Sequence, residues 1–244
     1  MFASIRPPSF PSGPAFVRWL VLGVALAARA PAAEPPAPVG EALHRYNPDP
    51  PIGWAYSVAV HRGTRESIES FDPTRPAGQR WTLQKVDGRP PTPQESDRYA
   101  RYRETTDTGN GARATFVRGD LDLNSVREVA NEPGSVSFHC SFRPEAPEPV
   151  LAHLDLQLVV GRDPARVRRS VLRLVAPYSP IFGVTMKSLV VETVYASPPG
   201  ENLDFPALRI SRFEGRVLGF WPIEESVETR YLSFHRVTPG GATQ

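Results

Sequence analysis

Apolar and polar residues alternate along much of the second half of the chain. Between 135 and 142 every second residue is apolar: Val136, Phe138, Cys140 and Phe142. The same period of two continues over 153–160, and it is typical of strands that bury one face. Shorter alternating or apolar runs predict further strands at 54–61, 66–71, 81–86, 166–175, 184–195, 208–213, 216–220 and 226–237.

Turn residues between these runs predict how the strands connect. The links are short, which favours antiparallel pairing of successive strands. Glu214 and Gly215 predict a two-residue hairpin turn between 208–213 and 216–220. The segment 123–131 fits either a helix or a short strand. The pattern predicts a mainly β (α+β) protein, with a curved antiparallel sheet or half-barrel of about ten strands and one or a few short helices.

One helix is predicted from its first turn. Thr92, Pro93 and Glu95 form a capping box, with Thr92 at the N-cap, Pro93 at the first helical position and Glu95 at the third. The helix should end near Glu104. A shorter helical turn is expected at 41–46, just before the sequence Asn-Pro-Asp-Pro-Pro.

The first 32 residues are typical of a secretory signal peptide. The apolar run at 19–28 (WLVLGVALAA) is shorter than the roughly 20 residues that a membrane-spanning helix needs. Arg6 and Arg18 supply positive charge before it, and Ala30-Pro31-Ala32 gives an A-x-A cleavage site. The alternative is a buried helix of the folded domain. We expect a periplasmic protein that is soluble and has no membrane span after cleavage.

The rest of the chain divides by composition into three parts. Residues 33–51 are predicted to be a Pro-rich N-terminal linker, 52–238 a single β-rich domain, and 239–244 a disordered tail. Outside residues 1–32, 25 basic residues face 26 acidic ones in the 244-residue chain. Nucleic-acid binding requires a clear positive excess, so no nucleic-acid partner is expected.

Candidate chemistry is sparse. The sequence contains no nucleophile elbow and no metal motif of paired His or Cys, and its five His are dispersed. The single cysteine, Cys140, excludes an internal disulfide and is expected to be a buried apolar residue. We therefore predict that the protein is not an enzyme and has no cofactor or metal.

The strands carry an unusually aromatic set of residues on their alternating apolar side: Trp54, Tyr56, Trp81, Phe138 and Phe142. A curved sheet either fills this face with its own side chains or leaves it open for an apolar ligand. We predict these five as ligand-binding residues, with plain core packing as the alternative. Arg168, Arg169 and Arg173 share one strand, where an inward Arg would meet an anionic headgroup, but a solvated face is the preferred interpretation.

The segment 80–92 (RWTLQKVDGRPPT), with the capped helix after it, resembles a recurrent feature of exported proteobacterial proteins. Their overall plan is similar to the periplasmic lipoprotein-carrier superfamily, the LolA/LolB-like half-barrel. The resemblance implies a curved antiparallel sheet, helices across its concave side, and an apolar cavity between them.

Two functions follow as hypotheses. The first is a periplasmic binding or carrier protein that sequesters an apolar or acylated ligand, such as a lipid, in a sheet-lined cavity without catalysis. The second is an envelope scaffold or protein-interaction module with a filled core, no ligand and an envelope protein as its partner.

The signal peptide gives a direct test. N-terminal sequencing of protein recovered from the periplasm should begin at Ala33, because Pro31 disfavours cleavage beside it and Ala32 completes the A-x-A site. Recovery of the chain with residues 1–32 still attached would contradict both the cleavage site and the periplasmic location.

Overall fold

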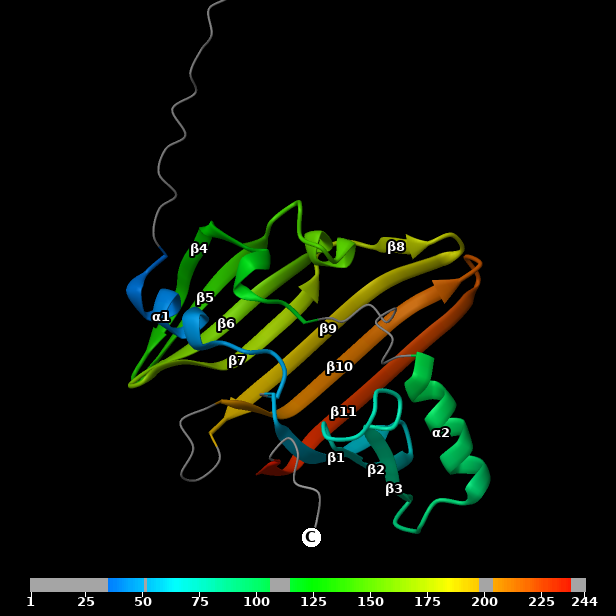
Figure 1. Ribbon diagram of the computed structural model, residues 1–244. Helices are drawn as coiled ribbons and strands as arrows, with labels where there is room; N and C mark the ends of the chain where they lie inside the picture. The colour runs from blue at the N-terminus through cyan, green and yellow to red at the C-terminus, as the bar shows by residue number, and fades with distance from the viewer. Residues whose placement is uncertain (1–34, 51, 106–114, 198–203, 238–244) are drawn as a thin grey trace, which may run out of the picture. The chain divides into compact units, whose positions relative to one another are not determined.

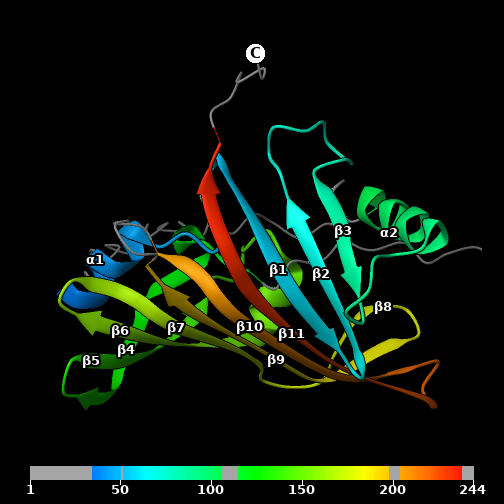
Figure 2. The same ribbon diagram turned by 90° about the horizontal axis from the view of Figure 1, so that it is seen from below.

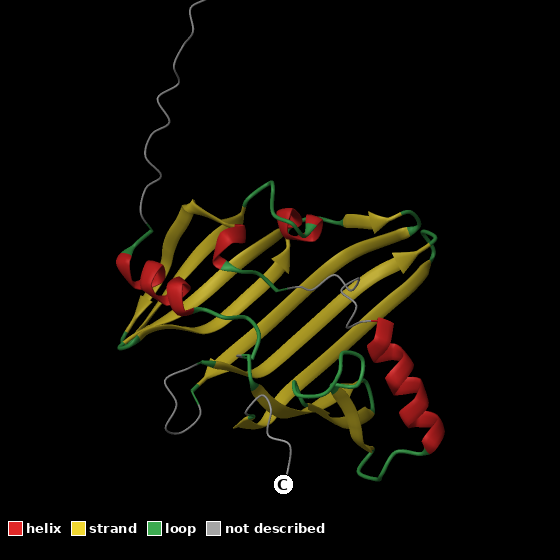
Figure 3. Ribbon diagram, in the orientation of Figure 1, coloured by secondary structure: helices red, strands yellow, loops and turns green. Residues whose placement is uncertain are grey.

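The computed structural model describes residues 35–50, 52–105, 115–197 and 204–237. The predicted signal peptide (1–32) and tail (239–244) lie outside the described residues. Strands dominate the described part, which forms one large antiparallel sheet with two α-helices (Figure 3). No helix within the described ranges combines the length and apolarity of a membrane span.

The elements follow one another along the chain as Figure 1 labels them. The helices are α1 (Ala37–Arg45) and α2 (Pro93–Thr105), with single 3₁₀ turns at Arg118–Asp120 and Pro149–His153. The strands are β1 (Trp54–Arg62), β2 (Arg65–Phe71), β3 (Trp81–Val86), β4 (Leu121–Glu132), β5 (Ser135–Phe142), β6 (Leu154–Arg162), β7 (Ala165–Leu174), β8 (Tyr178–Ile181), β9 (Val184–Ala196), β10 (Phe205–Val217) and β11 (Trp221–Arg236).

The sheet is open and its strands run in the order β3-β2-β1-β11-β10-β9-β7-β6-β5-β4, with β8 paired to β9. Most neighbours are consecutive along the chain, as the short links predict. The pair β1–β11 is different, because it joins the first strand to the last, from Trp54 opposite Arg236 to Arg62 opposite Val227. The predicted fold class is confirmed, and Figure 2 shows the curvature of the long strands.

The sheet face on which α1 lies is called the inner face here. Side chains fill one half of it. Helix α1 packs on β7 and β6, and its buried Val39, Ala42 and Leu43 have the i, i+3, i+4 spacing of one helix face. Phe116 and Leu151 complete the cover over β5 and β6. Beneath them lie the alternating apolar side chains of the two strands, which form the core: Val136, Phe138, Cys140, Phe142, Leu154, Leu156, Leu158 and Val160.

Cys140 is buried in this core, as predicted. Burial, with a smaller contribution from Asp155, raises the pKa of its thiol to about 12. At neutral pH the side chain is therefore a protonated, apolar filler and not a thiolate.

The range 33–51, expected to be a Pro-rich linker with a helical turn at 41–46, contains α1, which begins earlier, at Ala37. Pro36 lies at the N-cap and Pro38 in the first helical turn, where a residue without an N–H loses no helical hydrogen bond. The Pro-rich composition therefore marks the start of a helix. The ambiguous segment 123–131 is a strand, part of β4.

The predicted hairpin turn at Glu214 and Gly215 was also wrong. Strand β10 continues through both residues, with a register shift against β9 at that point. A Cβ on Gly215 would lie 2.7 Å from the Thr185 carbonyl oxygen, so glycine permits a close backbone approach there. The turn comes later, where Leu218 and Gly219 have φ values of 51° and 77°.

The capping box of α2 is present as predicted. The Thr92 amide donates to Glu95 Oε2 at 2.8 Å, and the Glu95 amide donates to Thr92 Oγ1 at 3.3 Å. Arg89 adds two hydrogen bonds to the same carboxylate. The hydrogen bonds from Arg89, followed by the Thr92 amide, lower the pKa of Glu95 to about 2.

Replacing Thr92 tests the importance of this cap. Thr92→Ala should lower the free energy of unfolding by about 1 kcal/mol, because the first-turn amide loses its acceptor. Chemical denaturation measures the change. Thr64→Ala, at an exposed turn whose side chain makes no hydrogen bond among the described residues, is the control and should change little. Equal stabilities for the parent and Thr92→Ala would show that the cap does not hold the helix.

Candidate functional site

The other half of the inner sheet face is hollow. A cavity of about 1100 Å³ lies between α2 and the sheet strands, chiefly β1, β2, β3, β10 and β11. Alternate residues of each strand line it, as expected for one face of a pleated sheet. The apolar part of the lining comprises Tyr56, Val58, Val60, Phe71, Trp81, Leu83, Val86, Val191, Val227 and Tyr231.

An aromatic cluster closes one end of this cavity. The Tyr56 ring lies 5.0 Å from Phe71, stacked, and 5.6 Å from Trp81, edge to face. Tyr231 lies 5.8 Å from Tyr56. Burial raises the pKa of Tyr56 above its ordinary value, so this hydroxyl stays protonated. The cluster gives the cavity an apolar wall with phenolic hydroxyls on it.

Helix α2 is tied to the sheet by a polar network around Glu69. Arg103 forms a short salt bridge with Glu69, and Tyr99 donates to Glu69 Oε2 at 2.8 Å. Arg103 also donates to the Tyr99 hydroxyl at 3.0 Å and lies 4.0 Å from the centre of the Trp81 ring. No side chain from 93 to 104 is fully buried, so polar contacts such as this network attach the helix to the sheet.

The network keeps Arg103 charged and Tyr99 protonated. Burial alone would lower the pKa of Arg103, but Tyr99 and Glu69 hold it above its ordinary value. Burial, reinforced by the Glu69 charge, raises the pKa of Tyr99. Arg103 therefore stays charged, Tyr99 stays a hydrogen-bond donor, and Glu69 has a cation and two hydroxyl partners, the second being Ser67 at 3.0 Å.

A row of polar residues crosses the middle of the same sheet face. Ser170 pairs with Thr193, Thr193 with Arg209, and Arg209 with Thr229, on the neighbouring strands β7, β9, β10 and β11. Arg209 lines the cavity and donates to Thr193 Oγ1 and to the Pro48 carbonyl, each at 3.3 Å. Within the described ranges it forms no salt bridge.

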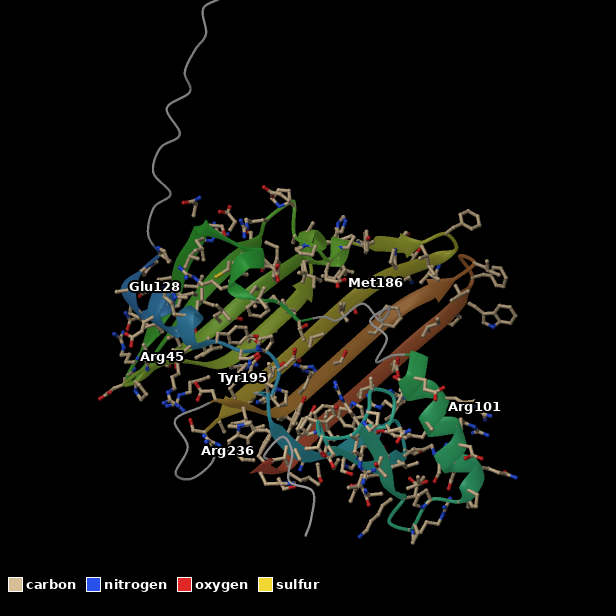
Figure 4. All side chains as sticks on the ribbon, viewed as in Figure 1. Arg45, Arg101, Glu128, Met186, Tyr195 and Arg236 are labelled. Atoms are coloured by element: carbon tan, nitrogen blue, oxygen red, sulfur yellow. The ribbon has the colours of Figure 1, made fainter. Side chains whose placement is uncertain are left out.

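Tyrosine hydroxyls surround this arginine. The hydroxyls of Tyr46 and Tyr195 are 2.8 Å apart, and Tyr195 lies on β9 beside the end of α1 (Figure 4). Burial raises the pKa of Tyr46 and of Tyr231, while the Arg209 charge works in the opposite direction on both. Three tyrosine hydroxyls therefore act on the Arg209 charge, with Asp49 as an acidic contributor.

The structure does not bring the five predicted ligand-binding residues together. Tyr56 and Trp81 line the cavity. Trp54 is buried, packs against Phe205 at 4.9 Å and is not among the lining residues. Phe138 and Phe142 lie in the filled half of the sheet face, where they form core.

The sequence pattern missed Arg209 for a physical reason. In β10, Leu208 and Ile210 alternate with Arg209 and Ser211, so a period of two predicts the arginine on the outer face. The structure turns it inward, and leaves both aliphatic side chains half-buried on the other side. The arginines considered in β7, Arg168, Arg169 and Arg173, are exposed, as the preferred interpretation predicted.

Metal-ligating side chains do not gather in the part of the chain that the structure describes. No three His, Cys, Asp or Glu side chains lie close enough together there to hold an ion. The polar groups of the cavity include carboxylates as well as arginines, tyrosines and hydroxyls, and the last three can donate hydrogen bonds to an anion or to an ether or ester oxygen.

Comparisons with known proteins give a weak structural likeness. No family model and no curated protein matches the sequence. Among solved structures, the chain is similar to a LolA superfamily protein from Nitrosomonas europaea, with a TM-score of 0.35 and 14% identity over 83% of this chain and 92% of that chain. It is also similar to an isomerase-inactive variant of GphF DH1, with a TM-score of 0.15 and 10% identity over 83% and 81% of the chains. Neither likeness carries an argument about function at these scores.

The Glu69 network predicts a specific loss of stability. Arg103→Met should lower the free energy of unfolding by about 2–3 kcal/mol, because a buried carboxylate loses its cation. The double variant Arg103→Met, Glu69→Gln should recover part of this loss, since the uncompensated charge is gone. Denaturant titration measures both. Arg98→Met, an exposed position on the same helix, is the control, and a similar small change in all three variants would contradict the network.

Proposed function

We propose that the protein binds an apolar or acylated ligand and sequesters it, without catalysis, in the cavity between α2 and the sheet. This proposal rests on the difference between the two halves of one sheet face. Side chains fill the face under α1, whereas under α2 about 1100 Å³ is left open against apolar and aromatic residues. Ligand pockets usually have volumes of about 300–1,000 Å³, so this space accommodates a lipid-sized molecule.

The lining is suited to an acyl chain. Each buried CH₂ group contributes about 0.8 kcal/mol, so roughly ten of them give about 8 kcal/mol before the entropy cost of binding. Val58 and Val60 on β1 and Val227 on β11 offer apolar surface on two paired strands, whereas Leu83 on β3 is separated from Val58 by Glu69 of β2. Aromatic rings at one end offer further contact area.

We place this activity in the periplasm, on the basis of the signal peptide predicted at 1–32. A carrier there keeps an apolar molecule out of water between two membranes. The protein's role in this proposal ends with binding and release, and no covalent step is assigned to it.

One observation favours the second candidate, an envelope scaffold or protein-interaction module. Large apolar side chains are exposed at the β8–β9 and β10–β11 turns: Ile181, Phe182, Leu218, Phe220 and Trp221. The Leu218 amide donates to the Gly183 carbonyl at 2.6 Å, which holds the two turns side by side. Exposed apolar patches often mark interaction surfaces. Native mass spectrometry of protein from its own host separates the two functions, since a co-purifying lipid mass favours the first and a stoichiometric protein partner the second.

Cavity filling tests the first proposal. The parent should bind a fluorescent fatty-acid probe with a fixed stoichiometry, and Val227→Trp should weaken binding by about tenfold or more, because indole occupies space that the probe needs. Ser226→Trp places the same side chain next to it but on the opposite sheet face, and should bind like the parent. Fluorescence titration measures all three.

Phe138→Ala separates the filled half from the cavity. It should cost roughly 3–5 kcal/mol of stability, because it leaves a void in packed core. The folded variant should still bind the probe like the parent. Absence of probe binding by the parent would refute the carrier function and leave the scaffold function standing.

A further inference from the structure

Arg209 differs from two other largely enclosed arginines, one on α2 and one on the sheet. Arg103 is neutralised by Glu69, and Arg166, on β7, by Asp204 at 3.1 Å. Arg209 has only the neutral oxygens of Thr193 and Pro48 within hydrogen-bond distance, and no salt bridge within the described ranges. An enclosed cation without a carboxylate is costly, so its retention favours a partner that comes from outside the chain.

The guanidinium retains capacity for such a partner. It has five N–H donors, and the two hydrogen bonds at 3.3 Å leave three of them for other acceptors. Arg209 is among the residues that line the cavity, together with Ser211, Thr229 and Tyr231. A planar guanidinium can donate two parallel hydrogen bonds to the oxygens of a carboxylate or phosphate. A neutral headgroup does not accept such a charge-assisted pair.

The charges around the cavity also favour an anionic ligand. Six arginines line it against four acidic residues: Arg62, Arg65, Arg80, Arg98, Arg103 and Arg209, with Asp49, Glu66, Glu69 and Glu95. Glu69 is paired with Arg103 and Glu95 with Arg89, while Arg62 is paired with Glu225 and Arg65 with Asp87 and Glu95. Asp49 is the acidic residue facing Arg209 from the segment before β1, but it is exposed and forms no salt bridge with it.

We propose that Arg209 binds the anionic headgroup, a carboxylate or phosphate, of an amphiphile whose apolar tail lies in the cavity. The inference rests on the proposed function and narrows its ligand class from apolar molecules to acidic amphiphiles. The hydroxyls of Thr229 and Tyr231 lie next to Arg209 on the neighbouring strand and supply further donors. The tail then extends along β1 over Val60 and Val58 toward the aromatic cluster.

Displacement of a neutral fluorescent lipid probe tests the headgroup separately from the tail. The competitors share one alkyl chain and differ in the head: dodecanoate, dodecyl phosphate and dodecanol, at a pH where both acids are ionised. Acetate and inorganic phosphate supply the same anions without a tail. The parent should bind the two acidic amphiphiles on the order of tenfold more tightly than dodecanol, the gain of one charge-assisted contact. The tail-less anions should not compete.

Three variants assign the preference to one side chain. Arg209→Met should abolish it, so that the acids bind no better than dodecanol, while dodecanol binds as it does to the parent. Arg209→Lys should retain part of the preference, because it keeps the charge but not the paired donors. Arg212→Met removes an exposed arginine from the opposite face of the same strand and should behave like the parent. Thermal unfolding of each variant confirms that it is folded.

The outcomes separate this inference from the proposed function. Binding of dodecanol and both acids with equal affinity, unchanged in Arg209→Met, would overturn the headgroup site and keep the apolar carrier. If Arg209→Met weakened the binding of all three competitors equally, the headgroup site would likewise be overturned, because the arginine would then only support the cavity. Competition by inorganic phosphate as strong as by dodecyl phosphate would replace the amphiphile with a free anion. Failure of the probe and of every amphiphile to bind the parent would refute the proposed function itself.

Discussion

The structure depends on shielding one face of a single open sheet from water. That face carries the apolar residues of strands from β5 at one side to β3 at the other, and a sheet of this size has no second sheet against it. Helix α1 covers its half with three buried aliphatic side chains. Helix α2 has no fully buried side chain and is attached to the sheet through a polar network. The same sheet face is therefore filled under α1 and leaves a cavity under α2.

Arg103 and Arg209, two of the six arginines that line the cavity, illustrate how context decides the role of one residue type. Arg103 contacts Glu69, Tyr99 and the Trp81 ring, so its hydrogen bonds attach helix α2 to the sheet. Arg209 donates to a threonine hydroxyl and a backbone carbonyl, and it forms no salt bridge within the described ranges, although the exposed Asp49 faces it. The first is a structural ion pair, and the second gives the middle of the sheet face a positive potential.

Local rules in the sequence predicted much of the fold and little of the site. Strand β5 and the cap of α2 were predictable because period-two alternation and the Thr92–Glu95 spacing are signals within a few residues. Gly215 was misinterpreted because a glycine marks both turns and bulges, and only the approach of Thr185 from β9 distinguishes them. The cavity could not be predicted, since Phe138 and Tyr56 have the same alternation but lie under different helices.

Strand β1 also determines when the chain can acquire its structure. One of its long edges pairs with β2, which is close in sequence, but the other waits for β11, from Arg236 opposite Trp54 to Val227 opposite Arg62. Until that last strand has been synthesised, the region of β1–β3 has no connection to the rest of the sheet and exposes an unpaired edge. Such distant pairing is associated with slow folding, so the complete sheet forms only after β11 has been synthesised.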